Sequence, residues 1–334
     1  MPGTPEKKKL LEVKGLRTCF QVEDKFAKAV DGVDFNIYEN EVLGLVGESG
    51  CGKSVTALSI LRLIPDPPGR ITDGEILFRG RDMLKLSYPE MRRIRGKDIS
   101  MIFQEPMTSL NPVFSIGWQL EEAVRFHQEN LTSKQVEVRA VEMLGLVGIP
   151  SPKERLNDYP HQFSGGMRQR VMIAMALGSD PALLIADEPT TALDVTIQAQ
   201  ILDLMLEVKK KTRDAAILLI THDLAVVAET CQRVAVMYGG QIQEISGVKP
   251  LFDGPLHPYT RGLLKSLPGF KNEPGIRLPV IEGMVPDILS FPKGCKFNNR
   301  CPEVMPECRE LEPELVEVSP GRQVRCHKCP KKQV

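Results

Sequence analysis

The chain has 334 residues, and its 43 Lys plus Arg balance 43 Asp plus Glu to a formal net charge of zero, which argues against a broad basic surface for nucleic acid. No apolar run approaches the ~18 residues of a membrane span, and the opening MPGTPEKKK lacks a signal peptide's apolar stretch, so we expect no transmembrane segment. With 42% hydrophobic residues, the chain can bury one large α/β core plus one or two smaller satellites.

The first predicted elements are short strands within residues 10–40 and 71–80, which form an antiparallel flank. Between them, VLGLVG at 42–47 reads as a buried strand and SVTALSILRLI at 54–64 as a helix. The segment that joins these two elements, GESGCGKS, matches the pattern G-x-x-x-x-G-K-[ST]. The sequence therefore predicts a phosphate-binding loop between a strand and a helix. A purely geometric Gly-rich turn is the alternative.

The residue types in this loop suit a nucleotide. Its glycines let successive N–H groups point into one concavity, and the helix N-terminus adds partial positive charge. Lys53 can reach the β and γ phosphates, and the Ser54 hydroxyl is placed to ligate Mg²⁺. The residues expected to contact the nucleotide are Gly47, Ser49, Gly50, Cys51, Gly52, Lys53, Ser54 and Val55.

The next acidic motif lies over a hundred residues downstream, which is too far for a simple connection and predicts an inserted subdomain. Segments 116–128 and 132–148 have apolar residues at helical spacing, whereas the basic run RRIRGK at 92–97 reads as a solvated loop. In FSGGMRQRVMIAMALG, Ser164 is a plausible N-cap, and Gly165 and Gly166 leave the first helical turn bare for an anion. Ordinary Ser-Gly-Gly loop chemistry is the alternative.

LLIADEP at 183–189 has the pattern of a central parallel strand whose C-terminal end faces a ligand. Asp187 would hold magnesium and Glu188 would polarise the attacking water. A solvated acidic turn is the alternative interpretation. A helix at 196–211 follows, with apolar residues at helical spacing.

Five features now stand in order: the phosphate loop, FSGGM, the strand with its Asp-Glu pair, ALD at 192–194 and the histidine of ITHDL at 220–224. Over about residues 10–245 this set resembles the ATP-binding subunits of ABC transporters. The resemblance implies an α/β fold, a P-loop NTPase (RecA-like) core with an antiparallel β flank, which hydrolyses ATP sandwiched between two ATPase subunits. Met167 departs from the family pattern, because many members have glutamine after Ser-Gly-Gly.

The resemblance also carries over roles for single residues. Gln104 in MIFQEP links the insertion to magnesium and to the attacking water, and His222 contacts the γ-phosphate. Ser164, Gly165 and Gly166 face the nucleotide of the opposite subunit, and Asp194 borders that interface. The implied catalytic residues are Lys53, Gln104, Glu188 and His222, and the implied Mg²⁺ ligands are Ser54, Gln104 and Asp187.

An aromatic side chain that stacks on adenine is expected on an early strand. Phe26 is the preferred candidate over Phe20, and either residue could instead belong to the core.

The character of the chain changes after residue 246, where eight prolines fall between 250 and 292 and long helices are not expected. Five of the eight cysteines lie beyond this point. Disulfides are disfavoured because a nucleotide-hydrolysing core works in a reducing compartment, so the cysteines indicate a small Pro-rich metal-binding module. Spacing alone does not separate zinc from an iron–sulfur cluster.

Four further segments carry a narrower resemblance: HPYTRGLL at 257–264, EGMVPD at 282–287, GCKFNNRCPEVMPEC at 294–308 and VRCH at 324–327. They are similar to the C-terminal region of oligopeptide and dipeptide importer ATPases, some of which hold a [4Fe-4S] cluster. By position, the resemblance implies the ligands Cys295, Cys301, Cys308 and Cys326 and leaves Cys329 spare.

The expected organisation is a catalytic core at 10–103 and 177–245, a helical subdomain at 104–176 and a C-terminal extension at 246–334. The resemblance implies an ATPase, with ATP and Mg²⁺, that energises peptide import from the cytoplasmic face of the cell membrane. Its implied partners are two transmembrane permeases that dock near residues 106–116, a paralogous ATPase subunit or a second copy of the chain, and indirectly an extracytoplasmic peptide-binding protein. No nucleic acid partner is expected.

Two alternatives stay open. One is a soluble ABC-type ATPase that acts on nucleic acid or ribosomes, which a single core and zero net charge disfavour. The other is an importer of another cargo, such as nickel or oligosaccharide.

Overall fold

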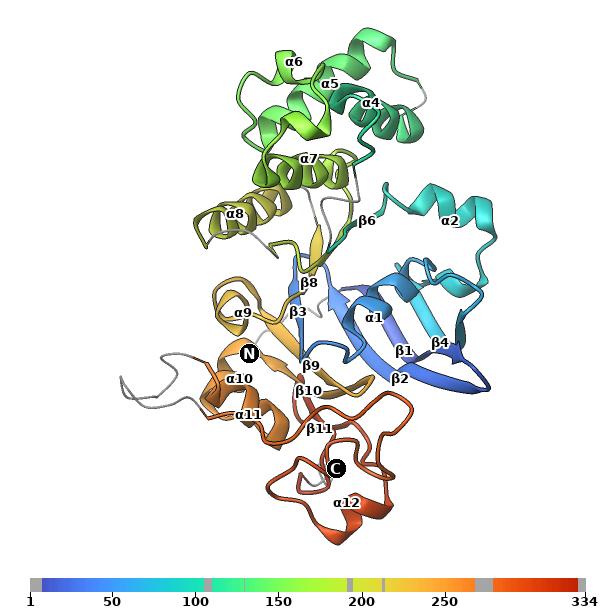
Figure 1. Cartoon of the computed structure of the whole chain (residues 1–334), viewed down its shortest axis with the longest axis vertical. Helices are drawn as coiled ribbons and strands as arrows, with labels where there is room; N and C mark the ends of the chain where they lie inside the picture. The colour runs from blue at the N-terminus through green and yellow to red at the C-terminus, as the bar shows by residue number, and fades with distance from the viewer. Residues whose placement is uncertain are drawn as a thin grey trace, which may run out of the picture. The chain divides into compact units, whose positions relative to one another are not determined.

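The computed structural model describes residues 8–104, 110–128, 130–190, 195–211, 214–267 and 279–329 (Figure 1). By packing, the chain forms two compact units. Unit 1 is Met1–Lys85 with Ile220–Val334, and unit 2 is Leu86–Leu219. The functional division expected from the sequence is a different one, and it stays a prediction.

Unit 1 contains a four-stranded antiparallel sheet with the order β2-β1-β4-β5. The predicted antiparallel flank is confirmed, but the expectation of short strands is wrong, because β1 and β2 each run for 14 residues. Gly15 and Gly32 lie within these strands at positive φ, and the pairing register of β1 with β2 shifts there. The two glycines therefore form β-bulges, and the strands continue where turns were expected. The elements are β1 (Lys9–Val22), β2 (Lys25–Tyr38), β4 (Gly69–Phe78), β5 (Arg81–Asp82) and the 3₁₀ helix η1 (Met83–Lys85).

Unit 1 also contains part of a second sheet, in which β3 (Val42–Val46) and β9 (Arg233–Tyr238) pair in parallel. Every residue of β3 is buried, as the continuous apolar run predicted. Helix α9 (Leu224–Thr230) packs on β3, and α1 (Lys53–Ile60) packs on β1 and β2. The predicted helix at 54–64 is therefore present but shorter, because Arg62 adopts a φ of 52° and Pro65 follows.

The C-terminal part of unit 1 is hydrogen-bonded into this second sheet. Strand β9 pairs with β10, β10 with β12, and β12 with β11, all antiparallel. Glu244 on β10 is fully buried and accepts hydrogen bonds from the amides of Leu256 and His257 and from Arg322. The elements are β10 (Gln241–Gly247), α10 (Val248–Asp253), α11 (Pro258–Lys265), α12 (Pro306–Glu310), β11 (Val316–Ser319) and β12 (Arg322–Val324).

Unit 2 combines the strand order β8-β7-β6 with a helical part. The helices predicted at 116–128 and 132–148 are confirmed, and their starts follow from local chemistry: Ser115 caps α4, and Thr132 forms a capping box with Gln135 at the start of α5. Helix α7 packs on α4, α5, α8 and β6. The elements are α2 (Tyr88–Ile94), β6 (Ile99–Ile102), α4 (Ile116–His127), α5 (Ser133–Leu146), α6 (Pro152–Arg155), η2 (Pro160–Gln162), α7 (Gly165–Leu177), β7 (Leu183–Asp187), α8 (Val195–Lys211) and β8 (Ala216–Ile220).

In the part of the chain that the structure describes, no helix combines the length and the apolar character needed to span a bilayer.

Candidate nucleotide-binding site

The phosphate loop connects β3 to α1, as predicted, and two of its glycines are required by the fold. A Cβ on Gly47 would lie 2.1 Å from the Met237 carbonyl oxygen, and one on Gly52 would lie 2.3 Å from the Ala29 carbonyl oxygen. Both residues also have positive φ, 154° and 103°. The loop therefore sits tightly against neighbouring backbone, in a shape that side chains at these positions would not permit.

Lys53 lies at the first position of α1 and is 5% exposed. Its Nζ donates to the carbonyl oxygens of Gly47 at 2.8 Å and Glu48 at 3.1 Å, so the ammonium is already held over the loop. Gly50 and Ser49 are exposed beside it, whereas Cys51 is buried. Burial raises the pKa of Cys51, so this thiol stays protonated and inert. The remaining predicted contacts, Ser54 and Val55, are half-buried on α1.

The acidic motif lies at the C-terminal end of β7 in unit 2. Asp187 is the last residue of the strand and is 4% exposed. Glu188 follows with a φ of 45°, a left-handed conformation that turns the chain sharply as it leaves the strand. The Nε2 of Gln104 donates to Glu188 Oε2 at 3.0 Å, so the structure brings two of the predicted catalytic residues together.

The signature segment forms the start of α7, as predicted. Ser164 has extended dihedrals and its side chain accepts from the Met167 amide at 3.3 Å, which makes it the N-cap. Ser164 and Gly165 are exposed and Gly166 is half-buried. From the next turn of the same helix, buried Gln169 donates through Nε2 to the carbonyl oxygen of Pro189.

Three further predicted positions have different outcomes. His222 lies exposed before α9 in unit 1. Phe26 is 69% exposed at the start of β2, whereas the Phe20 ring packs against Gly69, where an added Cβ would approach it to 2.7 Å. The exposed ring is the one available for stacking. Asp194 lies outside the described residues.

Four of the five C-terminal cysteines share one cavity of about 20 Å³ in unit 1. His257, Phe297 and Pro258 also line it. Burial raises the pKa of Cys295 to about 11 and also raises the pKa of Cys301 and Cys326. Burial therefore favours the protonated thiols near neutral pH, and a bound cation would favour the thiolates. The cavity cysteines are Cys295, Cys301, Cys308 and Cys326.

The donors in this cavity fit a soft metal chemically, because thiols gather there beside apolar side chains. However, no three His, Cys, Asp or Glu side chains among the described residues converge in a group that could hold a single metal ion. Cys329 does not line the cavity, and its amide donates to the Cys326 carbonyl oxygen at 3.1 Å.

Known proteins resemble this chain over nearly its whole length. A probable peptide ABC transporter ATP-binding protein of Sinorhizobium fredii is 52% identical, covering 98% of this chain and 97% of that protein. A dipeptide transport ATP-binding protein of Bacillus subtilis is also 52% identical, covering 95% and 94%. The ABC transporter family matches residues 30–191, and the family described as the C-terminal region of oligopeptide/dipeptide transporters matches residues 244–308.

This chain belongs to the ATP-binding subunits of the oligopeptide/dipeptide ABC transporter family.

Solved structures agree with that family. A dimeric ATP-binding cassette in a post-hydrolysis state with ADP and phosphate superposes with a TM-score of 0.64 at 26% identity, covering 71% of this chain and 98% of that one. The fold of an ABC ATPase is thereby confirmed, and the chain is an enzyme that hydrolyses ATP.

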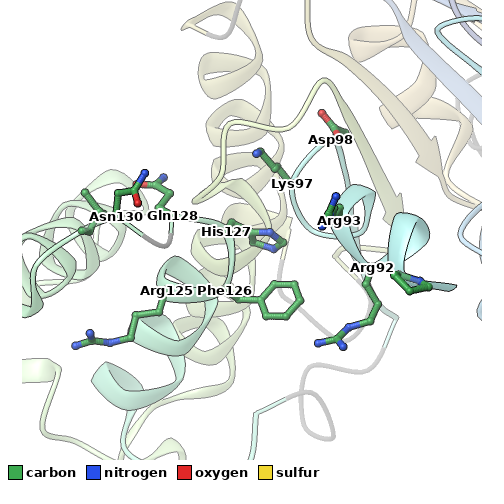
Figure 2. A pocket seen from close by; sticks show the side chains of 11 residues that line it. Arg92, Arg93, Lys97, Asp98, Arg125, Phe126, His127, Gln128 and Asn130 are labelled. Carbon is green, nitrogen blue, oxygen red and sulfur yellow. The ribbon is translucent and has the colours of Figure 1, made fainter. Parts of the chain in front are cut away.

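This ABC ATPase also carries a basic pocket of about 830 Å³ in unit 2 (Figure 2). Arg92 and Arg93 lie on α2, so the expected loop is wrong for residues 92–94. Residues 95–97 lie beyond the helix, and the expected solvent exposure is confirmed at Arg92, Arg93 and Lys97. The Arg92 guanidinium lies 5.2 Å from the centre of the Phe126 ring, which comes from the end of α4. Burial, together with the charge of Lys97, lowers the pKa of His127 in the pocket wall.

Sequence reasoning missed several residues that touch the predicted site. Gln169 reaches the segment after Glu188, and Tyr259 and Arg300 both bind Glu48 in the phosphate loop. No local signal marks the last two, since they lie 211 and 252 residues from Glu48 in the chain.

Proposed function

We propose that this ATPase energises the import of dipeptides or oligopeptides from the cytoplasmic face of the cell membrane. The observation that carries the proposal is the 52% identity with peptide-transport ATP-binding proteins over 95% or more of the chain. The match includes the C-terminal region described for oligopeptide/dipeptide transporters, which is a more specific feature than the ATPase motifs.

The phosphate loop binds the nucleotide. Lys53 exchanges its bonds with two loop carbonyl oxygens for the β and γ phosphates, and the loop amides with the α1 N-terminus supply further positive potential. The adenine stacks on Phe26. Ser54 and Asp187 provide hard oxygen ligands of the kind that Mg²⁺ prefers. When bound with ATP, magnesium neutralises charge that develops on the phosphates.

Glu188 orients the water that attacks the γ-phosphate, and Gln104 holds the carboxylate in place through its 3.0 Å bond. Gln104 also contacts magnesium in this assignment. His222 contacts the γ-phosphate and stabilises the charge that develops there.

Hydrolysis requires a second ATPase subunit, either a paralogue or another copy of this chain. Ser164, Gly165 and Gly166 face the nucleotide held by that subunit, and Asp194 borders the interface. The exposed N-terminus of α7 supports this role, because it offers amides and a positive helix end to the γ-phosphate.

Two permease subunits couple hydrolysis to transport and dock near residues 106–116, of which 106–109 lie outside the described residues. An extracytoplasmic binding protein delivers the peptide to the permeases. The test is reconstitution with the cognate permeases and binding protein in proteoliposomes. Uptake of labelled dipeptide or oligopeptide that depends on ATP supports the proposal. Transport of only nickel or oligosaccharide, or ATPase activity stimulated by DNA or ribosomes instead, contradicts it.

For the cysteine cavity we propose a [4Fe-4S] cluster bound by Cys295, Cys301, Cys308 and Cys326. One observation supports a metal group here, because four thiols line one cavity. The cluster is proposed in place of zinc from the resemblance of residues 294–308 and 324–327 to importer ATPases, some of which hold a [4Fe-4S] cluster. Cys329 lies outside the cavity lining and is the matched control.

The test is iron, zinc and acid-labile sulfide analysis of the chain purified without oxygen. We expect about four irons and four sulfides per chain. Cys326→Ser should lose most of this iron, whereas Cys329→Ser should keep it. One zinc without sulfide, or equal losses in the two variants, would overturn the assignment.

A further inference from the structure

One residue of the phosphate loop is held by the C-terminal region at both its side chain and its backbone. The two carboxylate oxygens of Glu48 accept from Arg300, Oε2 from Nη1 at 2.7 Å and Oε1 from Nη2 at 3.0 Å. The Glu48 amide donates to the Tyr259 hydroxyl at 2.9 Å. All three residues belong to unit 1, so the arrangement lies within one compact body.

These contacts are well placed to be strong. The pair of Glu48 and Arg300 is bidentate and charge-assisted, and the Arg300 side chain is only 4% exposed. Such a pair is screened less than a surface ion pair. The hydrogen bond with Glu48 raises the pKa of Arg300, so the guanidinium stays charged at every physiological pH.

Aromatic packing fixes the donor and acceptor groups before any nucleotide arrives. Tyr259 is fully buried, and its ring centre lies 4.7 Å from that of Tyr238 and 5.3 Å from that of Phe297. The Arg300 guanidinium lies 5.8 Å from the Tyr238 ring centre. The groups that hold Glu48 therefore have little rotamer freedom of their own.

The same segment makes a second contact near the nucleotide side. We call residues 295–301 the cysteine loop, because it begins and ends at cysteines of the cavity. Lys296 in this loop donates to Asp31 at 2.7 Å and to the carbonyl oxygen of Gly239 at 3.0 Å. Gly240, the next residue, donates its amide to the carbonyl oxygen of Cys51 in the phosphate loop at 3.0 Å.

We propose that the C-terminal region sets the nucleotide affinity of this ATPase, with Arg300 and Tyr259 as positioning residues that act through Glu48. The carbonyl oxygens of Gly47 and Glu48 hold Lys53, so the orientation of their peptide planes decides where the ammonium stands. The Glu48 amide shares a peptide plane with the Gly47 carbonyl, so the bond with Tyr259 fixes that plane, and the bonds with Arg300 hold the Glu48 side chain beside it. The loop is then shaped before the phosphates bind, and less ordering is required on binding.

This inference rests on the ATPase activity and is independent of the peptide cargo and of the metal. The test is calorimetric titration of the full chain with MgADP and MgATP. We expect Arg300→Met to weaken nucleotide binding about tenfold and Tyr259→Phe about threefold, as loss of one charged and one neutral hydrogen-bonding group predicts. Arg300→Lys keeps the positive charge but cannot make the two parallel hydrogen bonds of the guanidinium, so we expect an affinity between those of the wild type and Arg300→Met. Lys293→Met removes an exposed lysine that pairs with Glu310, and we expect unchanged affinity.

A double-mutant cycle separates positioning from general destabilisation. If Arg300 acts through Glu48, Arg300→Met should add nothing to the affinity loss already caused by Glu48→Gln. Amide hydrogen exchange should rise at residues 47–54 in Arg300→Met and not in Lys293→Met. Additive losses, or affinities within twofold of the wild type in both Arg300→Lys and Tyr259→Phe, would overturn the proposal. If Arg300→Met does not fold, the nucleotide affinities and amide exchange profiles of Arg300→Lys and Tyr259→Phe test the proposal in its place.

Discussion

The phosphate loop and the signature turn are the two proposed anion sites at helix N-termini, and the structure builds them in opposite ways. In the phosphate loop, Lys53 and Cys51 are buried, and Tyr259 of α11 and the amide of Gly240 hydrogen-bond to the loop backbone. Arg300 of the cysteine loop binds the Glu48 side chain. In the signature turn, Ser164 and Gly165 are exposed, and Ser164 caps its own helix. A site that binds its ligand within one chain can be shaped by that chain. A surface that completes a neighbour's site has to remain open until the neighbour arrives.

The largest expected effect is on turnover, from the carboxylate proposed to orient the attacking water. A change at this residue should alter the rate of hydrolysis and leave nucleotide binding at both proposed anion sites unchanged. Glu188→Gln should keep nucleotide affinity and lower kcat by about 10²–10³-fold, since a neutral amide cannot act as the base. Steady-state ATPase assays check this, with exposed Glu207→Gln on α8 as the matched control. We also expect Glu188→Gln to trap an ATP-bound dimer in size-exclusion chromatography. Unimpaired turnover would contradict the role of Glu188.

A change in the buried anion site should already affect the monomer. Lys53→Met removes the cation that the loop carbonyl oxygens hold, and we expect MgATP affinity to fall about 100-fold. Calorimetry at concentrations where the chain is monomeric measures this. Lys85→Met removes an exposed lysine beside Asp82 and should leave affinity unchanged. Equal affinities in the two variants would show that Lys53 does not bind the phosphates.

A change in the open anion site should affect only the assembled enzyme. Ser164→Asp keeps a capping acceptor but places a negative charge where the partner's γ-phosphate should sit, so we expect ATPase activity to fall at least about tenfold. Nucleotide affinity of the monomer should stay within twofold. Ser164→Asn caps the helix without the charge and should retain most activity. If Ser164→Asp weakened binding in the monomer, the contrast between the two anion sites would fail.

The smallest effect is expected at the adenine. Phe26→Ala should weaken ATP binding about three- to tenfold, consistent with ~1 kcal/mol for one stacking contact, and should leave inorganic triphosphate binding unchanged. Because Phe26 is exposed, the thermal unfolding midpoint of the Phe26→Ala variant should barely change from that of the wild type. Phe20→Ala should do the reverse, lowering the midpoint and sparing ATP affinity. Calorimetry and thermal melts of both variants would show whether the two phenylalanines have been assigned correctly.

Local sequence signals predicted the elements that carry the nucleotide motifs. The apolar run of β3, the N-cap at Ser164 and the helical spacing of apolar residues at 116–128 and 132–148 each specify structure within a few neighbouring residues. The lengths of β1 and β2 could not be predicted in this way, because Gly15 and Gly32 are turn signals that the sheet absorbs as bulges.

Part of the candidate site depends on contacts that are distant in sequence. Arg300 is 252 residues from Glu48, and nothing in GESGCGKS indicates that its second residue is an anchor point. Similarly, the basic run at 92–97 gives no sign that α2 and the end of α4 together form a pocket. Such pairs follow from tertiary packing, which a single sequence does not reveal.

The hairpin of β11 and β12 has a consequence for solubility. Strand β10 is paired with β9 on one side, and residues Glu244 and Ile245 pair with β12 on the other. Beyond β12 the sheet ends at β11, a strand of four residues with an exposed glutamate, Glu317. A chain shortened before residue 316 would present the backbone of β10, flanked by Ile242 and Ile245, as an open template for intermolecular pairing. In an engineered fragment of this ATPase, the short charged hairpin therefore has to be kept with the nucleotide core to protect it from aggregation.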